Sequence, residues 1–139
     1  MSHLIAKIEK IESVDTLNIV SFECEEQKLQ MVSLELAEEI QIGVRVKLVC
    51  KPIAVALAKP TGEIESFRSM LSYSNQLKVQ IDTIKKGKLL SSLSLSLGTF
   101  SLESIMGTDA VERLSLKEGD EVIALIKANE LSILEVLDD

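Results

Sequence analysis

Hydrophobic and polar residues alternate along most of this chain. The cleanest case is the segment 89–97, in which serine and leucine alternate from Ser92 to Leu97. A period of two places successive side chains on opposite faces of a strand, so this segment predicts a half-buried β-strand. Alternating or continuously apolar runs of strand length predict further strands over residues 4–13, 17–24, 28–32, 44–51, 53–58, 77–84, 100–106, 121–127 and 130–136.

Two short helices are predicted between strands. Ser33 is a natural N-cap for one that runs through Ile40. Thr108 or Asp109 caps a second, which ends near Leu114. Each of these helices separates the third strand of a half-chain from the fourth.

The two halves of the chain repeat one another. Residues 43–57 and 119–133 both contain a turn glycine, an apolar strand that ends in a lysine, a short break and a second apolar strand. The openings match as well: Leu4, Ala6, Ile8 and Ile11 correspond in spacing to Leu77, Val79, Ile81 and Ile84. An internal repeat of this kind indicates two similar units. We therefore predict an all-β fold of two tandem OB-like five-stranded barrels, each with one short helix.

The repeat also predicts where the chain divides. The first lobe spans residues 1–59, and its strand 53–58 completes it; the second spans residues 75–139, and its strand 130–136 closes it. Residues 60–74 form the linker, which Pro60 and Gly62 interrupt near its start. The spacing of the apolar residues 64, 67, 70 and 71 allows one brief helix within it.

Composition excludes several functions. The net charge of −7 and the aromatic content of 3% argue against a nucleic-acid partner, which needs clustered cations or stacking platforms. No apolar run approaches the roughly 18 residues of a membrane span. The start of the chain lacks the apolar core of a signal peptide, so we expect a cytoplasmic protein with Cys24 and Cys50 reduced.

Catalytic and metal-binding patterns are missing from the sequence. It contains no Gly-x-Ser-x-Gly or P-loop motif and no EF-hand-like loop. His3 is the sole histidine, which argues against a histidine-based metal site within one chain. We therefore expect a binding protein rather than an enzyme.

Two motifs resemble those of a known family. Residues 116–128, Leu-Lys-Glu-Gly-Asp-Glu-Val-Ile-Ala-Leu-Ile-Lys-Ala, are similar to the closing motif of the Mop domain, also called TOBE (transport-associated OB). Residues 75–78, Asn-Gln-Leu-Lys, resemble its opening motif, Ser-Ala-Arg-Asn-Gln-Leu. The resemblance covers nearly the whole chain as a tandem pair, like the stand-alone di-Mop proteins. It implies molybdate or tungstate binding at interfaces between lobes or subunits, for storage, buffering or homeostasis, in a homotrimer without an organic cofactor.

The resemblance also implies where the oxyanion is held. The candidate residues are Ser33, Lys51, Ser74, Asn75, Gly107, Thr108, Lys127, Ala128 and Asn129. The chain departs from the family pattern at several of these places. Ser74 replaces the arginine of the opening motif, and the first lobe begins instead with Met1, Ser2 and His3. Leu36 and Ala110 stand where a later serine is usual, and Ile53 stands where the second lobe has Asn129. The alternative is therefore a tandem interaction or regulatory module that has lost anion binding.

The candidate side chains suit a tetrahedral dianion. Such an anion needs converging hydroxyl, amide and backbone N–H donors with one or two cations, and Lys51 and Lys127 recur at the end of the same strand in both lobes. Simpler interpretations remain for each. Ser33 fits an ordinary N-cap, the lysines fit strand ends that reach solvent, and Asn129 fits a turn.

Overall fold

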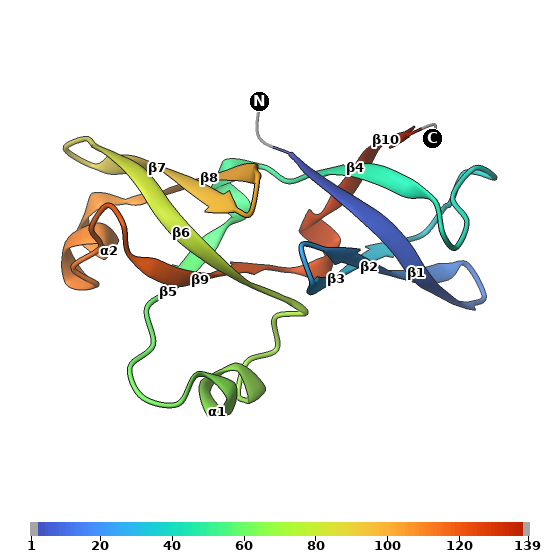
Figure 1. Cartoon of the computed structure of the whole chain (residues 1–139), viewed down its shortest axis with the longest axis horizontal. Helices are drawn as coiled ribbons and strands as arrows, with labels where there is room; N and C mark the ends of the chain where they lie inside the picture. Colours follow the sequence, from blue (N-terminus) through green and yellow to red (C-terminus); the bar gives the residue numbers. More distant parts are fainter. Residues whose placement is uncertain (1–2, 138–139) are drawn as a thin grey trace.

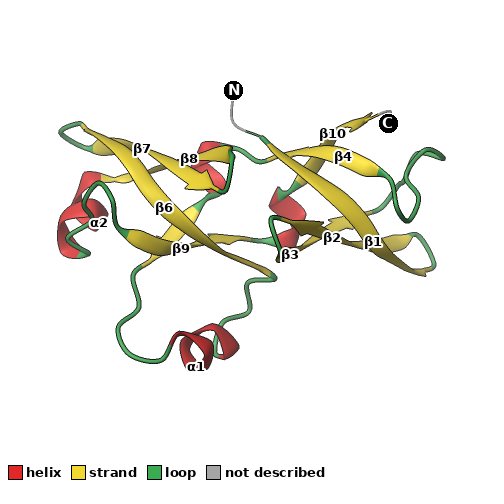
Figure 2. Ribbon diagram, in the orientation of Figure 1, coloured by secondary structure: helices red, strands yellow, loops and turns green. Residues whose placement is uncertain are grey.

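The protein consists of two curled five-stranded antiparallel sheets that lie side by side in an elongated molecule (Figures 1 and 2). The structure is a computed structural model that describes residues 3–137. Met1 and Ser2, at the start of the first lobe, and Asp138 and Asp139, at the end of the second, lie outside the described residues. The arrangement confirms the all-β fold of two OB-like barrels that the sequence predicts.

Each barrel is formed by one five-stranded sheet with its own strand order. Barrel one has the order β10-β4-β1-β2-β3 and contains β1 (Leu4–Val14), β2 (Leu17–Cys24), β3 (Gln27–Ser33), β4 (Arg45–Val49) and β10 (Ser132–Leu137). Barrel two has the order β5-β9-β6-β7-β8 and contains β5 (Ala56–Ala58), β6 (Asn75–Lys86), β7 (Leu90–Leu97), β8 (Phe100–Gly107) and β9 (Glu121–Ile126).

The two halves of the chain exchange their closing strands. The prediction that residues 53–58 complete the first lobe and residues 130–136 the second is wrong, because β5 pairs with β9 in barrel two and β10 pairs with β4 in barrel one. The reason lies in the breaks before these strands. The short 3₁₀ turns η1 (Pro52–Ala54) and η2 (Ala128–Glu130) are flanked on both sides by extended backbone, so the chain continues into the other barrel instead of folding back.

The two barrels share further details of the repeat. The first strand of each is irregular at the same place, between Ile8 and Lys10 in β1 and between Ile81 and Thr83 in β6. This β-bulge explains the three-residue step in the otherwise alternating apolar pattern. Gly43, with φ +93°, occupies the same position in barrel one that Gly119, with φ +92°, occupies in barrel two. Both glycines adopt a positive φ that other residues rarely do.

Only one of the two predicted barrel helices forms. α2 (Thr108–Arg113) confirms the second, although its N-cap is Gly107 rather than Thr108 or Asp109. The prediction of a helix over residues 33–40 is wrong, because Ser33 ends β3 and residues 34–40 form a bend, irregular chain and one turn. The backbone N–H of Glu35 donates to the Ser33 hydroxyl, which forms a local turn rather than a helix cap. The connection from β3 to β4, residues 34–44, is also two residues shorter than the connection from β8 to β9, residues 108–120. The linker helix, α1 (Ile64–Ser69), is present and lies outside both barrels (Figure 1).

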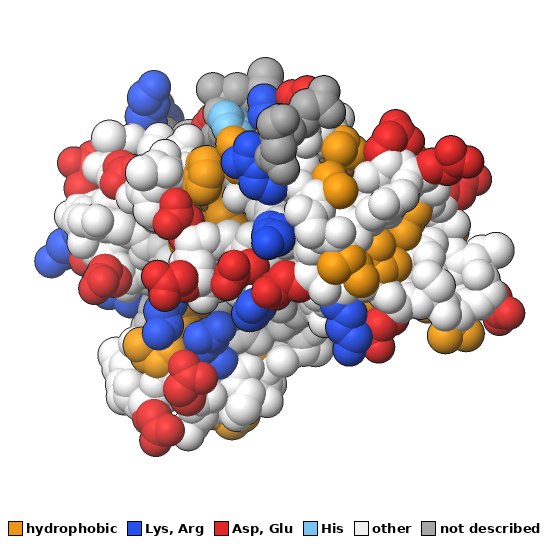
Figure 3. Space-filling model, turned by 45° about the vertical axis from the view of Figure 1, so that its right-hand side comes forward, with side chains coloured by type: hydrophobic (Ala, Val, Ile, Leu, Met, Phe, Trp, Pro, Cys, Tyr) orange, Lys and Arg blue, Asp and Glu red, His pale blue; other side chains and the backbone are white. Residues whose placement is uncertain are grey.

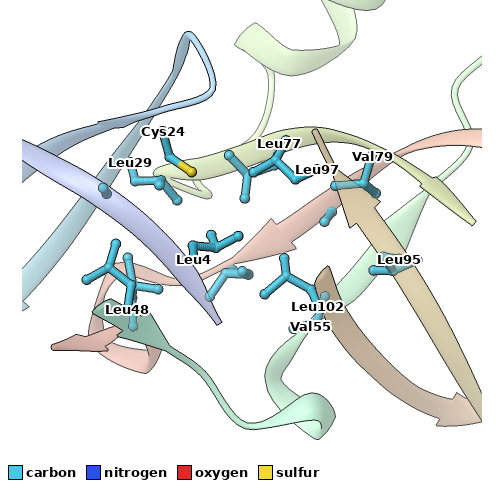
Figure 4. Packing of buried hydrophobic residues seen from close by; sticks show 14 of the residues in the cluster. Leu4, Cys24, Leu29, Leu48, Val55, Leu77, Val79, Leu95, Leu97 and Leu102 are labelled. Carbon is cyan, nitrogen blue, oxygen red and sulfur yellow. The ribbon is translucent and has the colours of Figure 1, made fainter. Parts of the chain in front are cut away.

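The hydrophobic core is continuous through both barrels. Figure 4 shows Leu4, Leu29 and Leu48 of barrel one approaching Leu77, Leu97 and Leu102 of barrel two. The leucine–serine alternation of β7 is confirmed, because its leucines at 93, 95 and 97 are buried whereas its serines at 92, 94 and 96 are half-buried. Within residues 3–137, no helix combines the length and apolar character needed to cross a bilayer.

Candidate functional site

Three of the predicted oxyanion residues gather where β10 joins β4. Lys51 and Asn129 line a hollow of about 310 Å³, and Ser33 and Asn129 line a second hollow of about 290 Å³. Asn129 and Ser132 border both hollows, so the two adjoin. We call this region, defined by Ser33, Lys51, Asn129 and Ser132, the Lys51 end.

The strand exchange builds the Lys51 end from both halves of the chain. Val49, at the end of β4, pairs with Ser132, at the start of β10. This pairing places the turn η2, which carries Asn129, against β3 and beside Lys51. The Lys51 ammonium has no ion-pair partner among residues 3–137, so its charge is available to a ligand.

Two further groups set the charge of this hollow. Cys50 lines it, and burial together with the nearby charge of Glu130 raises the pKa of the Cys50 thiol to about 11. The thiol is therefore neutral near pH 7. Glu130 also lines this hollow and opposes an anion, and Glu35 lines the adjoining hollow beside Ser33. Both side chains are exposed, which leaves them free to turn toward water.

The equivalent region lies where β5 joins β9, and it carries different side chains. Lys127 occupies the position of Lys51, and Ala56, which pairs with Leu125, occupies that of Ser132. Asn129 is replaced there by Ile53, which is 74% exposed. Strand register matches Ser33 of β3 with Met106 of β8. We call this region, defined by Ile53, Ala56, Met106 and Lys127, the Lys127 end.

Gly107 and Thr108 lie where β8 leads into α2. The Thr108 hydroxyl donates to the carbonyl of Gly87 at 2.8 Å and lies 2.8 Å from the Ser91 hydroxyl. Its backbone N–H donates to the carbonyl of Leu89 at 2.8 Å. Gly107 has φ −60°, which any residue adopts, and an added Cβ would approach only the exposed Asp109 side chain, which can move aside. Thr108 therefore fixes the turn from β8 into α2.

Asn75 holds the two barrels together. It is fully buried, its Oδ1 accepts the backbone N–H of Gln30 at 2.7 Å, and its Nδ2 donates to the carbonyl of Gln30 at 3.0 Å. The link is reciprocated, because the Gln27 side chain makes the same pair of hydrogen bonds with the backbone of Lys78. These amides bridge β3 and β6 as a backbone ladder would.

Ser74 lies apart from the Lys51 end, in a hollow of about 510 Å³ between α1, β6 and the β2–β3 turn. Arg68 of α1 lines the same hollow, donates from Nη2 to the carbonyl of Gln76 at 3.0 Å and pairs with Glu65. Sequence reasoning missed this guanidinium, although Arg68 is the one arginine of the linker. It places a cation near the motif position at which Ser74 replaces arginine.

The structure therefore divides the nine candidates. Ser33, Lys51 and Asn129 come together; Lys127 and Ala128 belong to the crossing segment that leads to Asn129; Ser74 and Asn75 border the seam between the barrels; Gly107 and Thr108 lie beside α2. Ser132 is a hydroxyl that sequence reasoning missed, because its place beside Lys51 depends on the exchange.

The described residues contain no cluster of three or more histidine, cysteine or acidic side chains suited to a metal ion. Acidic and basic side chains are interspersed on the face shown in Figure 3, without one large basic patch.

The fold and the paired crossing segments define a class: tandem OB-type barrels with exchanged closing strands. The TOBE domain model matches residues 71–133. Molybdenum-pterin-binding proteins 1 and 3 of Clostridium pasteurianum are 38% and 37% identical over 65 residues, which are 46% of this chain and 96% of each relative. The chain belongs to the Mop/TOBE domain family.

A solved structure matches almost the full length of the chain. The molybdate-binding protein ModG, solved with molybdate bound, superposes with a TM-score of 0.82 and 25% sequence identity. The match covers 95% of this chain and 94% of ModG. Both halves of the chain, and not the second alone, therefore share the architecture of a tandem protein.

Proposed function

We propose that this chain is a cytoplasmic molybdate- or tungstate-binding protein that stores or buffers the oxyanion, without an organic cofactor and without catalysis. The observation that carries the proposal is the Lys51 end, where a lysine, a serine and an asparagine border adjoining hollows. The names of its relatives support the same ligand, since the Clostridium proteins are described as molybdenum-pterin-binding and ModG as a cytoplasmic molybdate-binding protein.

The chemistry of the Lys51 end suits a tetrahedral dianion. The Lys51 ammonium neutralises part of the charge, and the Asn129 amide and the Ser132 hydroxyl supply directed donors. The Ser33 hydroxyl can join them by releasing the carbonyl of Glu35, to which it donates at 2.5 Å. Hydrogen bonds at close range determine anion capture, so the net charge of −7 does not prevent it. The anion would be held by several polar contacts rather than by a metal-ligand set.

We propose further that the chain acts as a homotrimer. Ser74 borders a different hollow from Lys51 within one chain, so a site that uses both residues needs a second copy. Light scattering coupled to size-exclusion chromatography gives the mass directly, and a trimer of the 15.3 kDa chain is the expected species.

Calorimetric titration of the purified oligomer with molybdate, tungstate and sulfate tests the ligand. We expect binding heat with molybdate and tungstate and a weaker or absent signal with sulfate. Silence with all three anions from an intact oligomer would overturn the proposal.

Silence with all three anions would favour the alternative, a tandem interaction or regulatory module. The observation on its side is that three of the candidate groups are already engaged within the chain: the Asn75 amide with Gln30, the Thr108 hydroxyl with Gly87 and the Ser33 hydroxyl with the carbonyl of Glu35. In that case the barrels serve assembly, and partner binding would be independent of oxyanions.

A further inference from the structure

We infer that the two ends of this chain are functionally unequal: the Lys51 end holds the oxyanion, and the Lys127 end does not. This inference rests on the proposed function and adds to it the place and the number of sites. Residue differences at matched positions carry it, since the backbone plan of the two ends is the same.

The backbones of the Lys51 end and the Lys127 end match element by element. Each end begins where a strand finishes in a lysine, continues through a three-residue 3₁₀ turn from the other half of the chain, and finishes in an exchanged strand. Ser132 pairs with Val49 at one end, and Ala56 pairs with Leu125 at the other. Side chains at matched positions therefore stand in similar places relative to their lysine.

The lysines themselves do not distinguish the ends. Lys51 and Lys127 are both exposed, and neither has an ion-pair partner within the described part of the chain. One ammonium alone is strongly hydrated and holds a dianion weakly in water, so neighbouring donors decide which lysine binds.

Those neighbours differ at every matched position. Asn129 corresponds to Ile53, Ser132 to Ala56 and Ser33 to Met106. The Lys51 end therefore presents the Asn129 amide and the Ser132 hydroxyl, together with the Ser33 hydroxyl, which donates to the carbonyl of Glu35 at 2.5 Å and would have to exchange that partner for the anion. The Lys127 end presents three apolar side chains. A dianion at the Lys127 end would lose part of its hydration beside groups that cannot replace it.

Glu130 works in the opposite direction, because its carboxylate lines the Lys51 hollow and has Ala54 as its counterpart. Its exposed side chain can move away, and the neutral Cys50 thiol adds no second negative charge. Glu35, at the adjoining hollow, is exposed in the same way. We therefore expect the donors of the Lys51 end to outweigh these two mobile carboxylates.

A matched set of variants tests the inference by molybdate titration of the full-length oligomer. Lys51→Gln is expected to weaken binding about tenfold or more, as the loss of a charged hydrogen-bond donor does. Lys127→Gln, which removes the same charge, is expected to change affinity by less than about twofold. Both positions are exposed, and chromatography with light scattering confirms that each variant keeps the wild-type assembly.

Exchanging the matched side chains between the two ends provides a second test of the inference. Asn129→Ile gives the Lys51 end the side chain of its counterpart and should reduce affinity, whereas Ile53→Asn should add binding capacity beyond that of the wild type. Both positions are exposed, so neither exchange disturbs the core.

The outcomes separate the two proposals. If the wild type binds molybdate but Lys127→Gln weakens binding as much as Lys51→Gln, or if neither variant weakens it, the inequality of the ends is wrong and the proposed function stands. If the wild type binds no oxyanion, the proposed function fails and this inference fails with it.

Discussion

The two places where the chain crosses between barrels share a backbone plan and differ in their side chains. At the Lys51 end, the crossing segment brings Asn129 and Ser132 beside a lysine; at the Lys127 end, it brings Ile53 and Ala56. Both segments leave their barrel through a short 3₁₀ turn and enter the other as a strand. The comparison shows that duplication preserves a scaffold while each copy of a site changes independently.

The largest expected effect is a loss of stability on removing a core side chain of barrel one. Leu48 is buried between Leu4 and Ile133 in barrel one, whereas barrel two has Ala124 at the same place. We expect Leu48→Ala to lower the free energy of unfolding by about 2–5 kcal/mol, because it removes core contacts and leaves a cavity. Urea denaturation of the wild type and the variant measures this difference in the free energy of unfolding.

The control is Leu134→Ala in β10, where the side chain is exposed and the change should stay within about 0.5 kcal/mol. A loss below about 1 kcal/mol for Leu48→Ala would show that barrel one closes around alanine as readily as barrel two does.

The second-largest effect on stability is expected at the seam between the barrels, where Asn75 and Gln27 lie. Asn75→Ala removes two hydrogen bonds and leaves the Gln30 backbone unpaired beside a buried site, so we expect a loss of about 1–3 kcal/mol. Gln27→Ala breaks the reciprocal pair on the exposed side of the seam and should cost less, about 0.5–1.5 kcal/mol. Chemical denaturation compares the two. A larger effect of Asn75→Ala on molybdate affinity than on stability would instead place Asn75 in contact with the anion.

A smaller effect is expected from the charge that only the Lys51 end carries. Glu130→Gln removes the carboxylate from the hollow, so molybdate should bind about two- to fivefold more tightly, which corresponds to roughly 0.5–1 kcal/mol at an exposed position. The gain should shrink as salt is added. Glu63→Gln in the linker makes the same change in net charge and serves as the control; an equal gain there would mean that overall charge, rather than Glu130, limits affinity.

The smallest expected effect lies at the end of β5. Lys59 donates to Asp120 at 2.9 Å and to the carbonyl of Ser115, which anchors the exchanged strand to barrel two. The hydrogen bond from Lys59, with a second from the Lys117 backbone, lowers the pKa of Asp120 below its usual value of 3.8. A carboxyl group with a lowered pKa stabilises the fold above its unfolded-state pKa, and this stability is lost as pH falls through the folded-state value.

Lys59→Met should therefore reduce the melting temperature modestly near pH 7, and the difference from the wild type should shrink as pH falls below 3.8 and through the lowered pKa of Asp120. Thermal melts across pH measure it. Asp120→Asn should remove the same pH dependence, and a difference that persists in acid would assign the effect of Lys59 to its bond with Ser115 instead.

Local patterns in the sequence were sufficient to predict the strands. Alternation identified most of them and continuous apolar runs identified β5 and β9, and the three-residue step between Ile8 and Ile11 corresponds to the β-bulge in β1. The helix over residues 33–40 was mispredicted, because the capping preference of Ser33 is also satisfied by a turn with Glu35. Short-range chemistry therefore determined where strands form and left that turn undecided.

Tertiary structure alone decided which barrel each closing strand joins. β5 and β10 both follow the same motif, and either could pair with the strand before it or with its repeat in the other half. Because the repeats are similar, alternation carries no information on this choice. The 3₁₀ turns at residues 52–54 and 128–130, which extended backbone flanks on both sides, carry each chain segment into the other barrel. The sequence by itself specified a lysine, a serine and an asparagine far apart in the chain, and only the exchange brought them to one place.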